Sequence, residues 1–136
     1  MSMSLLEFAA HISRAAIGLE PLIDDNLKKG CELFKDSAQT AIGTYRFNWP
    51  QLAPATLARK SGNTPLLETG ALKDSIVFNV SRGEAYVGTD HFVAAWQEFG
   101  TRTIPPRPFM GGALNEKGPH VQAVFGKALA AKMLAP

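Results

Sequence analysis

Apolar residues recur at steps of three and four along the first part of the chain, and this spacing restricts the fold more than any other feature. The series begins at Leu5 and ends at Ala41. Steps of this size place one apolar stripe along an α-helix. The stripe consists of Leu5, Phe8, Ile12, Ala16, Leu19, Ile23, Leu27, Cys31, Phe34, Ala38 and Ala41. We therefore expect a long N-terminal helix that packs by one face against the rest of the protein.

Local signals mark the start of this helix and a break within it. Ser4 and Glu7 have the spacing of a capping box, in which Ser4 is the N-cap. Pro21 falls inside the apolar stripe, where a proline removes one hydrogen bond and clashes with the preceding turn. We expect a kink, or a junction of two helices, near Gly18 to Pro21. The helical pattern ends by about Gly43.

Residues 44–74 are rich in turn signals, among them Trp49-Pro50 and Thr64-Pro65. A short helical turn is expected from Pro54 to Lys60, because proline suits the first position of a helix. A connection of this length inside a compact domain is commonly functional or disordered. The pairs Leu66-Leu67 and Ala71-Leu72 are expected to anchor it to the core.

The clearest strand pattern follows at residues 75–89. Ile76, Phe78 and Val80 share one face of an extended segment, as expected for a half-buried strand. Arg82-Gly83 supplies a tight turn, and residues 84–89 return in an extended form. The pattern predicts an antiparallel β-hairpin.

A short helix is expected at residues 91–99, capped by Thr89 or Asp90 and stopped by Gly100. We expect Trp96 to be the aromatic residue of this region that belongs to the core. Residues 101–109 hold three prolines, which fix φ and remove donors, so this segment is expected to be an extended, stiff arm.

Gly118-Pro119 is expected to open a C-terminal helix. Its apolar face would consist of Val121, Val124, Phe125, Ala128, Leu129 and Met133. The predicted fold class is therefore α+β, in one domain that covers residues 1–136. A chain of 136 residues is long enough for one domain and short for two.

Composition and charge narrow the function classes. The net charge of +2 is too small to indicate a nucleic-acid partner by itself. The single Cys31 rules out an internal disulfide and suits a reducing compartment. No apolar run approaches the roughly 20 residues that span a bilayer, and the N-terminus lacks a signal-peptide pattern. We expect a soluble protein with no membrane contact that is not exported by that route.

A search for enzyme motifs finds no metal-binding, nucleophile or phosphate-loop pattern. His11, His91 and His120 lie in different expected elements, and no close pair of metal ligands occurs. Cys31 lies on the apolar stripe, where a buried, inert thiol is expected. Asp24 and Asp25 are neighbours on a helix, so their side chains diverge. We expect no enzyme activity, no cofactor, no metal and no small-molecule substrate.

Two alternatives remain open. The basic pairs Arg59-Lys60 and Arg102 with Arg107 would suit a small DNA-binding module that acts in packaging or regulation, since arginine contacts phosphate well. A hydrolase with a site around Asp90, His91 and Glu98 is the other alternative.

We prefer contact with other proteins to these two alternatives, because Trp, Phe and Arg are enriched at the centres of protein interfaces. The candidate subunit-interface residues are Trp49, Arg59, Lys60, Arg102, Ile104, Pro105, Pro106, Arg107 and Phe109. A proline-stiffened arm loses little entropy when it docks onto a neighbour. We therefore expect an interface centred on residues 101–109.

Several motifs, in order, resemble a known family. The first run is Trp49-Pro-Gln-Leu52-Ala-Pro54-Ala-Thr56, then Lys60, then Leu66-Leu-Glu-Thr69-Gly70-Ala-Leu72. The second run is Tyr86-Val-Gly88-Thr89, Ala94 or Ala95, Gln97-Glu98-Phe99-Gly100-Thr101 and Pro105-Pro-Arg107-Pro108-Phe109. Together they resemble the phage virion-morphogenesis and tail-completion proteins, over roughly residues 45–112. Trp96 departs from the family pattern, which often has a histidine before the glutamine.

The resemblance implies a small α+β subunit that forms a homo-oligomeric ring at the head–tail junction or the end of the tail. Its partners would be other copies of itself and other head or tail proteins, with DNA at most nearby. It implies no catalysis. The protein would be part of the virion, assembled in the host bacterial cytoplasm.

Overall fold

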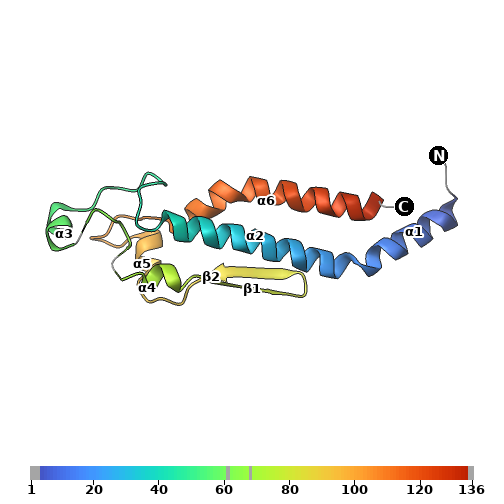
Figure 1. Ribbon diagram of the computed structural model, residues 1–136, viewed down its shortest axis with the longest axis horizontal. Helices are drawn as coiled ribbons and strands as arrows, with labels where there is room; N and C mark the ends of the chain where they lie inside the picture. Colours follow the sequence, from blue (N-terminus) through green and yellow to red (C-terminus); the bar gives the residue numbers. More distant parts are fainter. Residues whose placement is uncertain (1–3, 61, 68, 135–136) are drawn as a thin grey trace.

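The computed structural model describes residues 4–60, 62–67 and 69–134. Helix α2 (Leu19–Ala41) is the central element and lies between two layers. Helix α6 (Phe109–Leu134) runs antiparallel along one side of it, and the hairpin of β1 (Val77–Ser81) and β2 (Glu84–Gly88) covers the other (Figure 1). The fold is α+β, as the sequence predicts.

The remaining helices lie at the two ends of this elongated arrangement. Helix α1 (Leu5–Ile17) leads away from α2 beyond the tip of the hairpin. Helices α3 (Pro54–Arg59), α4 (Ala71–Asp74) and α5 (Ala94–Phe99) gather at the opposite end (Figure 1). The helical turn expected from Pro54 is confirmed as α3.

The expected break in the N-terminal helix is confirmed at Gly18, which ends α1 and begins α2. Pro21 is therefore in the first turn of α2, where the missing N–H breaks no helical bond. The capping box is also present. The backbone N–H of Glu7 donates to Ser4 Oγ at 3.2 Å, and the Glu7 carboxylate accepts from the backbone N–H of Ser4 at 2.7 Å.

The hairpin forms with the expected turn at Arg82-Gly83. Phe78 pairs with Val87 and Val80 with Ala85, and these partly buried residues share one face. Arg82 and Gly83 both have positive φ, the geometry of a type I′ turn that matches the twist of the strands. The backbone N–H of Gly83 donates to the Asp24 carboxylate at 2.8 Å, which fastens the turn to α2.

The core lies at the end of the molecule where α2 finishes and α6 starts. Its buried members are Ala38, Ala41, Ile42, Trp49, Leu72, Ile76, Ala94, Phe109 and Ala113. Leu66 and Leu67 pack against this cluster and Leu72 belongs to it, so these predicted anchors of the long connection are confirmed, while Ala71 is exposed. No helix within the described ranges is long and apolar enough to cross a membrane.

The start of the C-terminal helix was predicted wrongly. Helix α6 begins at Phe109, and Pro119 lies in its interior. The first turn is stabilised from outside, because the Glu98 carboxylate accepts from the backbone N–H groups of Met110 and Gly111 at 3.0 and 2.8 Å. The expected apolar face is partly buried at Val121, Phe125, Ala128 and Leu129 and exposed at Val124, while the side chain of Met133 lies outside the described residues.

The start of α5 and its expected cap also differ from prediction. The N-cap is Val93, with no side-chain hydrogen bond. Thr89 instead accepts from the backbone N–H of His91 at 3.0 Å and shapes the turn before the helix. Gly100 ends α5 as expected, with φ of +76°.

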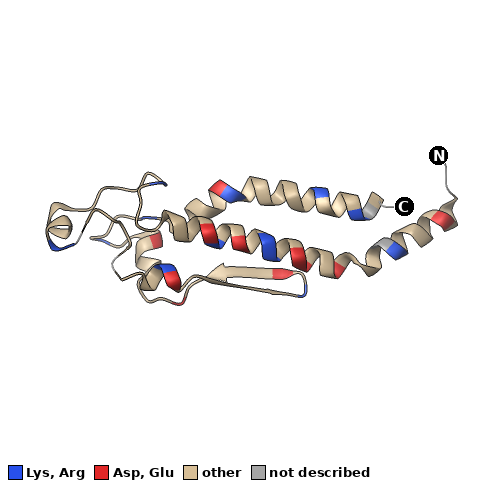
Figure 2. Cartoon of the chain, in the orientation of Figure 1, with Lys and Arg blue, Asp and Glu red and all other residues tan. Residues whose placement is uncertain are grey.

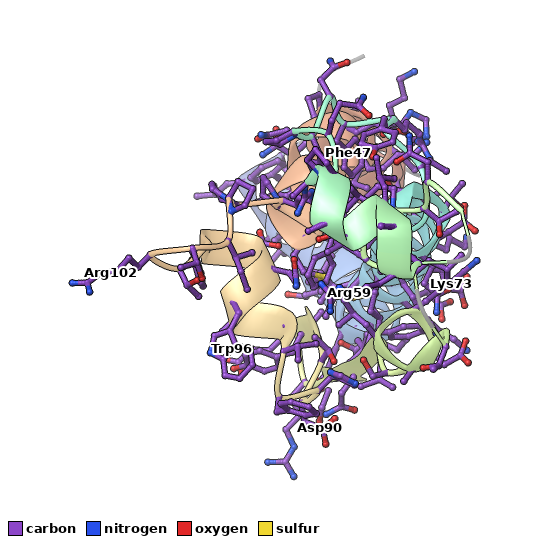
Figure 3. All side chains as sticks on the ribbon, turned by 90° about the vertical axis from the view of Figure 1, so that its left-hand side faces the viewer. Phe47, Arg59, Lys73, Asp90, Trp96 and Arg102 are labelled. Carbon is purple, nitrogen blue, oxygen red and sulfur yellow. The ribbon has the colours of Figure 1, made fainter. Side chains whose placement is uncertain are left out.

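Residues 101–108 contain neither helix nor strand, but they do not form a free arm. The backbone N–H of Thr101 donates to Ile104 O at 2.9 Å, which closes a tight bend. The backbone N–H of Arg107 then donates to Gln97 O at 2.6 Å and returns the segment to α5. Only the tip around Arg102 projects, as Figure 3 shows, and Phe109 already belongs to α6.

Candidate functional site

A cavity of about 670 Å³ opens at the end of the molecule where α3, α5 and the bend at residues 101–107 meet. We call it the end cavity. Arg59 and Lys60 line it from the end of α3, and Ile104, Pro105 and Arg107 line it from the bend. The structure therefore brings together these two groups of predicted interface residues, which are far apart in the sequence.

The remaining predicted interface residues lie elsewhere. Arg102 and Pro106 are exposed but do not line the cavity, and the Arg102 side chain points away from the body of the protein (Figure 3). Trp49 is 5% exposed and Phe109 is 1% exposed, so both lie beneath the surface. Their prediction as interface residues was wrong, because both aromatic side chains fill the core beside α2.

Arg107 lines the end cavity yet is only 6% exposed. Its Nε and Nη2 donate to Pro50 O at 3.2 and 3.0 Å, and Nη2 also donates to Gln51 O at 3.1 Å. The guanidinium is thus committed to two backbone carbonyls of the chain itself. The prediction that Arg107 contacts another subunit was therefore wrong, because its side chain holds the bend against residues 50–51.

An exposed aromatic stripe lies on and just before α5, formed by Phe92, Trp96 and Phe99. We call it the α5 aromatic surface. Trp96 is 49% exposed and Phe99 is 80% exposed. The Phe92 and Trp96 rings meet edge-on with centroids 5.9 Å apart, and the His91 ring stacks on Phe92 at 5.1 Å. Phe92 also lines the end cavity, so the stripe and the cavity are continuous.

The prediction that Trp96 is a core residue was wrong. Of the six residues of α5, Ala94 is the buried one, because so short a helix can turn only one narrow side inward. The spacing of Phe92, Trp96 and Phe99 was a usable signal. Steps of four and three put all three on one side of a helix, which marks them as a single surface.

A second apolar surface lies at the other end of the molecule, on α1. Leu5, Leu6 and Ile17 are 84%, 80% and 82% exposed, and Phe8 is half-exposed. Figure 1 places α1 and α5 at opposite ends of the long axis. The two surfaces also differ in kind, since α1 is mainly aliphatic and α5 is aromatic with cations beside it.

The residues of the hydrolase alternative do not form a catalytic arrangement. Both carboxylate oxygens of Glu98 accept backbone N–H groups at the start of α6. His91 Nδ1 accepts from the backbone N–H of Val93 at 3.4 Å. Asp90 is exposed at the outer edge of the molecule (Figure 3). Glu98 and His91 serve local structure, and among the described residues no hydrogen bond or ion pair joins the three side chains.

Other reactive groups offer little chemistry. Among the residues that the structure describes, no group of three His, Cys, Asp or Glu could hold a metal ion. Cys31 is buried in α2, and burial raises the pKa of its thiol, with a smaller contribution from Glu32. A raised pKa lowers the thiolate fraction at neutral pH, so the thiol is a poor nucleophile.

Comparisons of the chain with protein-family models, with curated proteins and with solved structures gave no match.

Proposed function

We propose that the chain is a structural assembly protein of a tailed phage or prophage, a subunit of a ring at the head–tail junction or at the end of the tail. The observation that carries the proposal is the pair of unlike apolar surfaces, α1 and the α5 aromatic surface, at opposite ends of one elongated molecule. Soluble monomers rarely expose large apolar patches that no partner covers.

Two unlike surfaces suit this role better than a pair of identical ones. A ring is built from heterologous contacts, in which one surface of a subunit meets a different surface of its neighbour. A subunit at a junction must also contact another protein of the particle. The α5 aromatic surface, with Arg59 nearby in the end cavity, has the aromatic and arginine side chains that are enriched in such contacts.

The sequence motifs support the proposal that the assembly is a phage particle. Residues 45–112 carry the ordered runs that resemble the virion-morphogenesis and tail-completion proteins. These runs supply core residues such as Trp49 and Leu72, and they also supply Phe99 of the α5 aromatic surface.

DNA binding is the weaker alternative. Arg107 is occupied by backbone carbonyls and cannot reach a phosphate without breaking those bonds. Acidic and basic residues also alternate along α2 (Figure 2). A DNA-binding face usually gathers cations on one side, so the charge pattern favours contact with protein.

The mass of the purified protein in solution tests the proposal. Light scattering and native mass spectrometry over a wide concentration range should show a closed oligomer, and electron microscopy should show rings. A chain that stays monomeric at high concentration and is missing from purified particles would contradict the proposal. Tight, salt-dependent binding to duplex DNA would favour the alternative.

Phe99→Ser tests the α5 aromatic surface. We expect a phage or prophage that lacks the gene to yield at least about ten-fold fewer infectious particles when complemented with this variant than with the native gene. The melting temperature should change little, because Phe99 is exposed in the monomer.

Tyr86→Ser is the matched control, since Tyr86 is an exposed aromatic residue of the hairpin that lies outside both apolar surfaces. Equal losses for the two variants would show that the α5 aromatic surface has no special role.

A further inference from the structure

A long apolar groove runs beside α2, between α6 and β2. We call it the α2–α6 groove. Leu27, Cys31 and Phe34 of α2 form one side, and Val121 and Phe125 of α6 form another. The groove has a volume of about 630 Å³. Among the described residues that line it, none is charged, so a charged occupant would lose its hydration without compensation.

The groove results from uneven packing of α2 against α6. At Gly30 the helices are close, because an added Cβ would stand 2.9 Å from Val121 Cγ1. At Gly126, farther along α6, an added Cβ would meet nothing within 4 Å. The space over Gly126 is therefore open, and an apolar side chain entering it would displace only water.

Helix α1 has the matching properties. Leu5, Phe8 and Ile12 are spaced at i, i+3 and i+7, which is the anchor pattern of helices that bind in apolar grooves. Its charged side chains and its histidine, Glu7, His11 and Arg14, lie in one narrow strip. That strip could face solvent while the apolar side lies in a groove.

We propose that α1 of one copy docks into the α2–α6 groove of a second copy. The inference rests on the proposed function, because it identifies the contact between neighbouring subunits. The lengths agree: at 1.5 Å per residue, α1 is about 20 Å long, and the groove follows α6 for about 24 Å. The α6 residues that line it extend from Met110 to Gly126.

The chain cannot place α1 in its own groove. Gly18 alone connects α1 to α2, whereas two helices that fold back on each other need a loop of about two to five residues. Figure 1 shows α1 continuing away from α2 at the end remote from the core. The contact is therefore between chains, and because helix and groove are different surfaces it can repeat from copy to copy.

Filling the groove tests the inference. Gly126→Leu would put a side chain into open space, so the monomer should keep or raise its melting temperature, since glycine is unfavourable inside a helix. We expect light scattering to show at least a ten-fold weaker association than for the native protein. Ala123→Leu is the control, because Ala123 is exposed on α6 outside the groove. It should leave the association unchanged.

Photo-crosslinking identifies the occupant. A benzophenone amino acid replacing Gln122, which lines the groove, should capture residues 5–17. The same probe replacing Ala123 should not. In a mixture of nitrogen-15-labelled and unlabelled chains, the cross-linked peptides should pair labelled with unlabelled partners.

The outcomes separate the two proposals. An oligomer that survives Gly126→Leu, or a probe that captures another segment or α1 of its own chain, would overturn the docking of α1 and leave the ring proposal standing. A native protein that is monomeric at every concentration would overturn both. Loss of the oligomer with Gly126→Leu alone, together with capture of a neighbour's α1, would support both.

Discussion

The guanidinium of Arg107 lies inside the molecule, where it donates to the carbonyls of Pro50 and Gln51. These partners are 57 and 56 residues away in the chain. Arginine is equally suited to interfaces, phosphates and buried carbonyls, so no local pattern distinguishes the roles. Only the fold reveals which one this residue performs.

Replacing Arg107 therefore tests a role in folding. We expect Arg107→Ala to lower the free energy of unfolding by about 2 kcal/mol, because the carbonyls of Pro50 and Gln51 lose a charged donor. Urea denaturation followed by circular dichroism would measure the loss. Arg102→Ala is the control, since Arg102 is exposed, and its stability should match that of the native chain. Equal stabilities for the two variants would contradict this role.

The two tryptophans are a second case in which the local sequence does not distinguish a buried side chain from an exposed one. Trp49 is buried against the edge of Phe47, with ring centroids 5.8 Å apart, while Trp96 is half-exposed. Both are large and apolar, so composition alone favours burial for either. Trp49 lies in a segment that packs into the core, whereas α5 turns only Ala94 inward and leaves Trp96 outside. This difference is set by the assembled fold.

At the scale of elements, the sequence predicted what local interactions decide. The capping box at Ser4, the junction at Gly18 and the hairpin turn at Arg82-Gly83 depend on residues a few positions apart, and all three are present. The start of α6 does not depend on local residues. Its cap is Glu98 of α5, more than ten residues upstream, and a carboxylate at a helix start is favoured by the exposed N–H groups there.

The connection between α5 and α6 depends on Gly100. Its φ of +76° and ψ of 170° lie in a region that is essentially restricted to glycine, and an added Cβ would stand 2.9 Å from Ile104 O and the Pro106 ring. We expect Gly100→Ala to lower the free energy of unfolding by about 3 kcal/mol. Chemical denaturation would measure the change.

Gly70→Ala provides the comparison for this variant. Gly70 also has positive φ, but an added Cβ would make only an ordinary contact, at 3.7 Å from the Asp74 carboxylate. This variant should lose only about 1 kcal/mol. Similar losses at the two positions would contradict the larger cost expected at Gly100.

At the scale of the whole molecule, the protein is a three-layer body with a core at one end and a lightly supported helix at the other. The sequence predicted the α+β class and most of the elements, but not helix α4 or the starts of α5 and α6. It did not predict the groove or the placement of the apolar surfaces, because these depend on how α2, α6 and the hairpin are spaced. Such spacing is set by contacts such as Gly30 with Val121, far apart in the chain.

Amide hydrogen exchange can measure how strongly α1 is protected in the monomer and in the oligomer. Because most of its large apolar side chains are exposed, α1 should exchange its amide hydrogens much faster than α2 in a dilute sample. At concentrations that favour the oligomer, exchange in residues 5–17 should slow by at least about ten-fold, while exchange in the hairpin stays constant. Mass spectrometry of peptides from both samples would show the difference. Unchanged exchange in an oligomeric sample would mean that α1 remains uncovered.

The one-residue junction at Gly18 has a geometric consequence for such an assembly. A Cβ at Gly18 would stand 2.8 Å from Lys132 Nζ, so the side chain of Lys132 lies beside the joint. With one residue between the two helices, the backbone angles of Gly18 set the direction of α1 relative to the groove on the same subunit. Each copy would add the same rotation about a common axis, and the size of that rotation would decide how many copies complete one turn. The circumference of the assembly would be encoded in the angle at a single glycine.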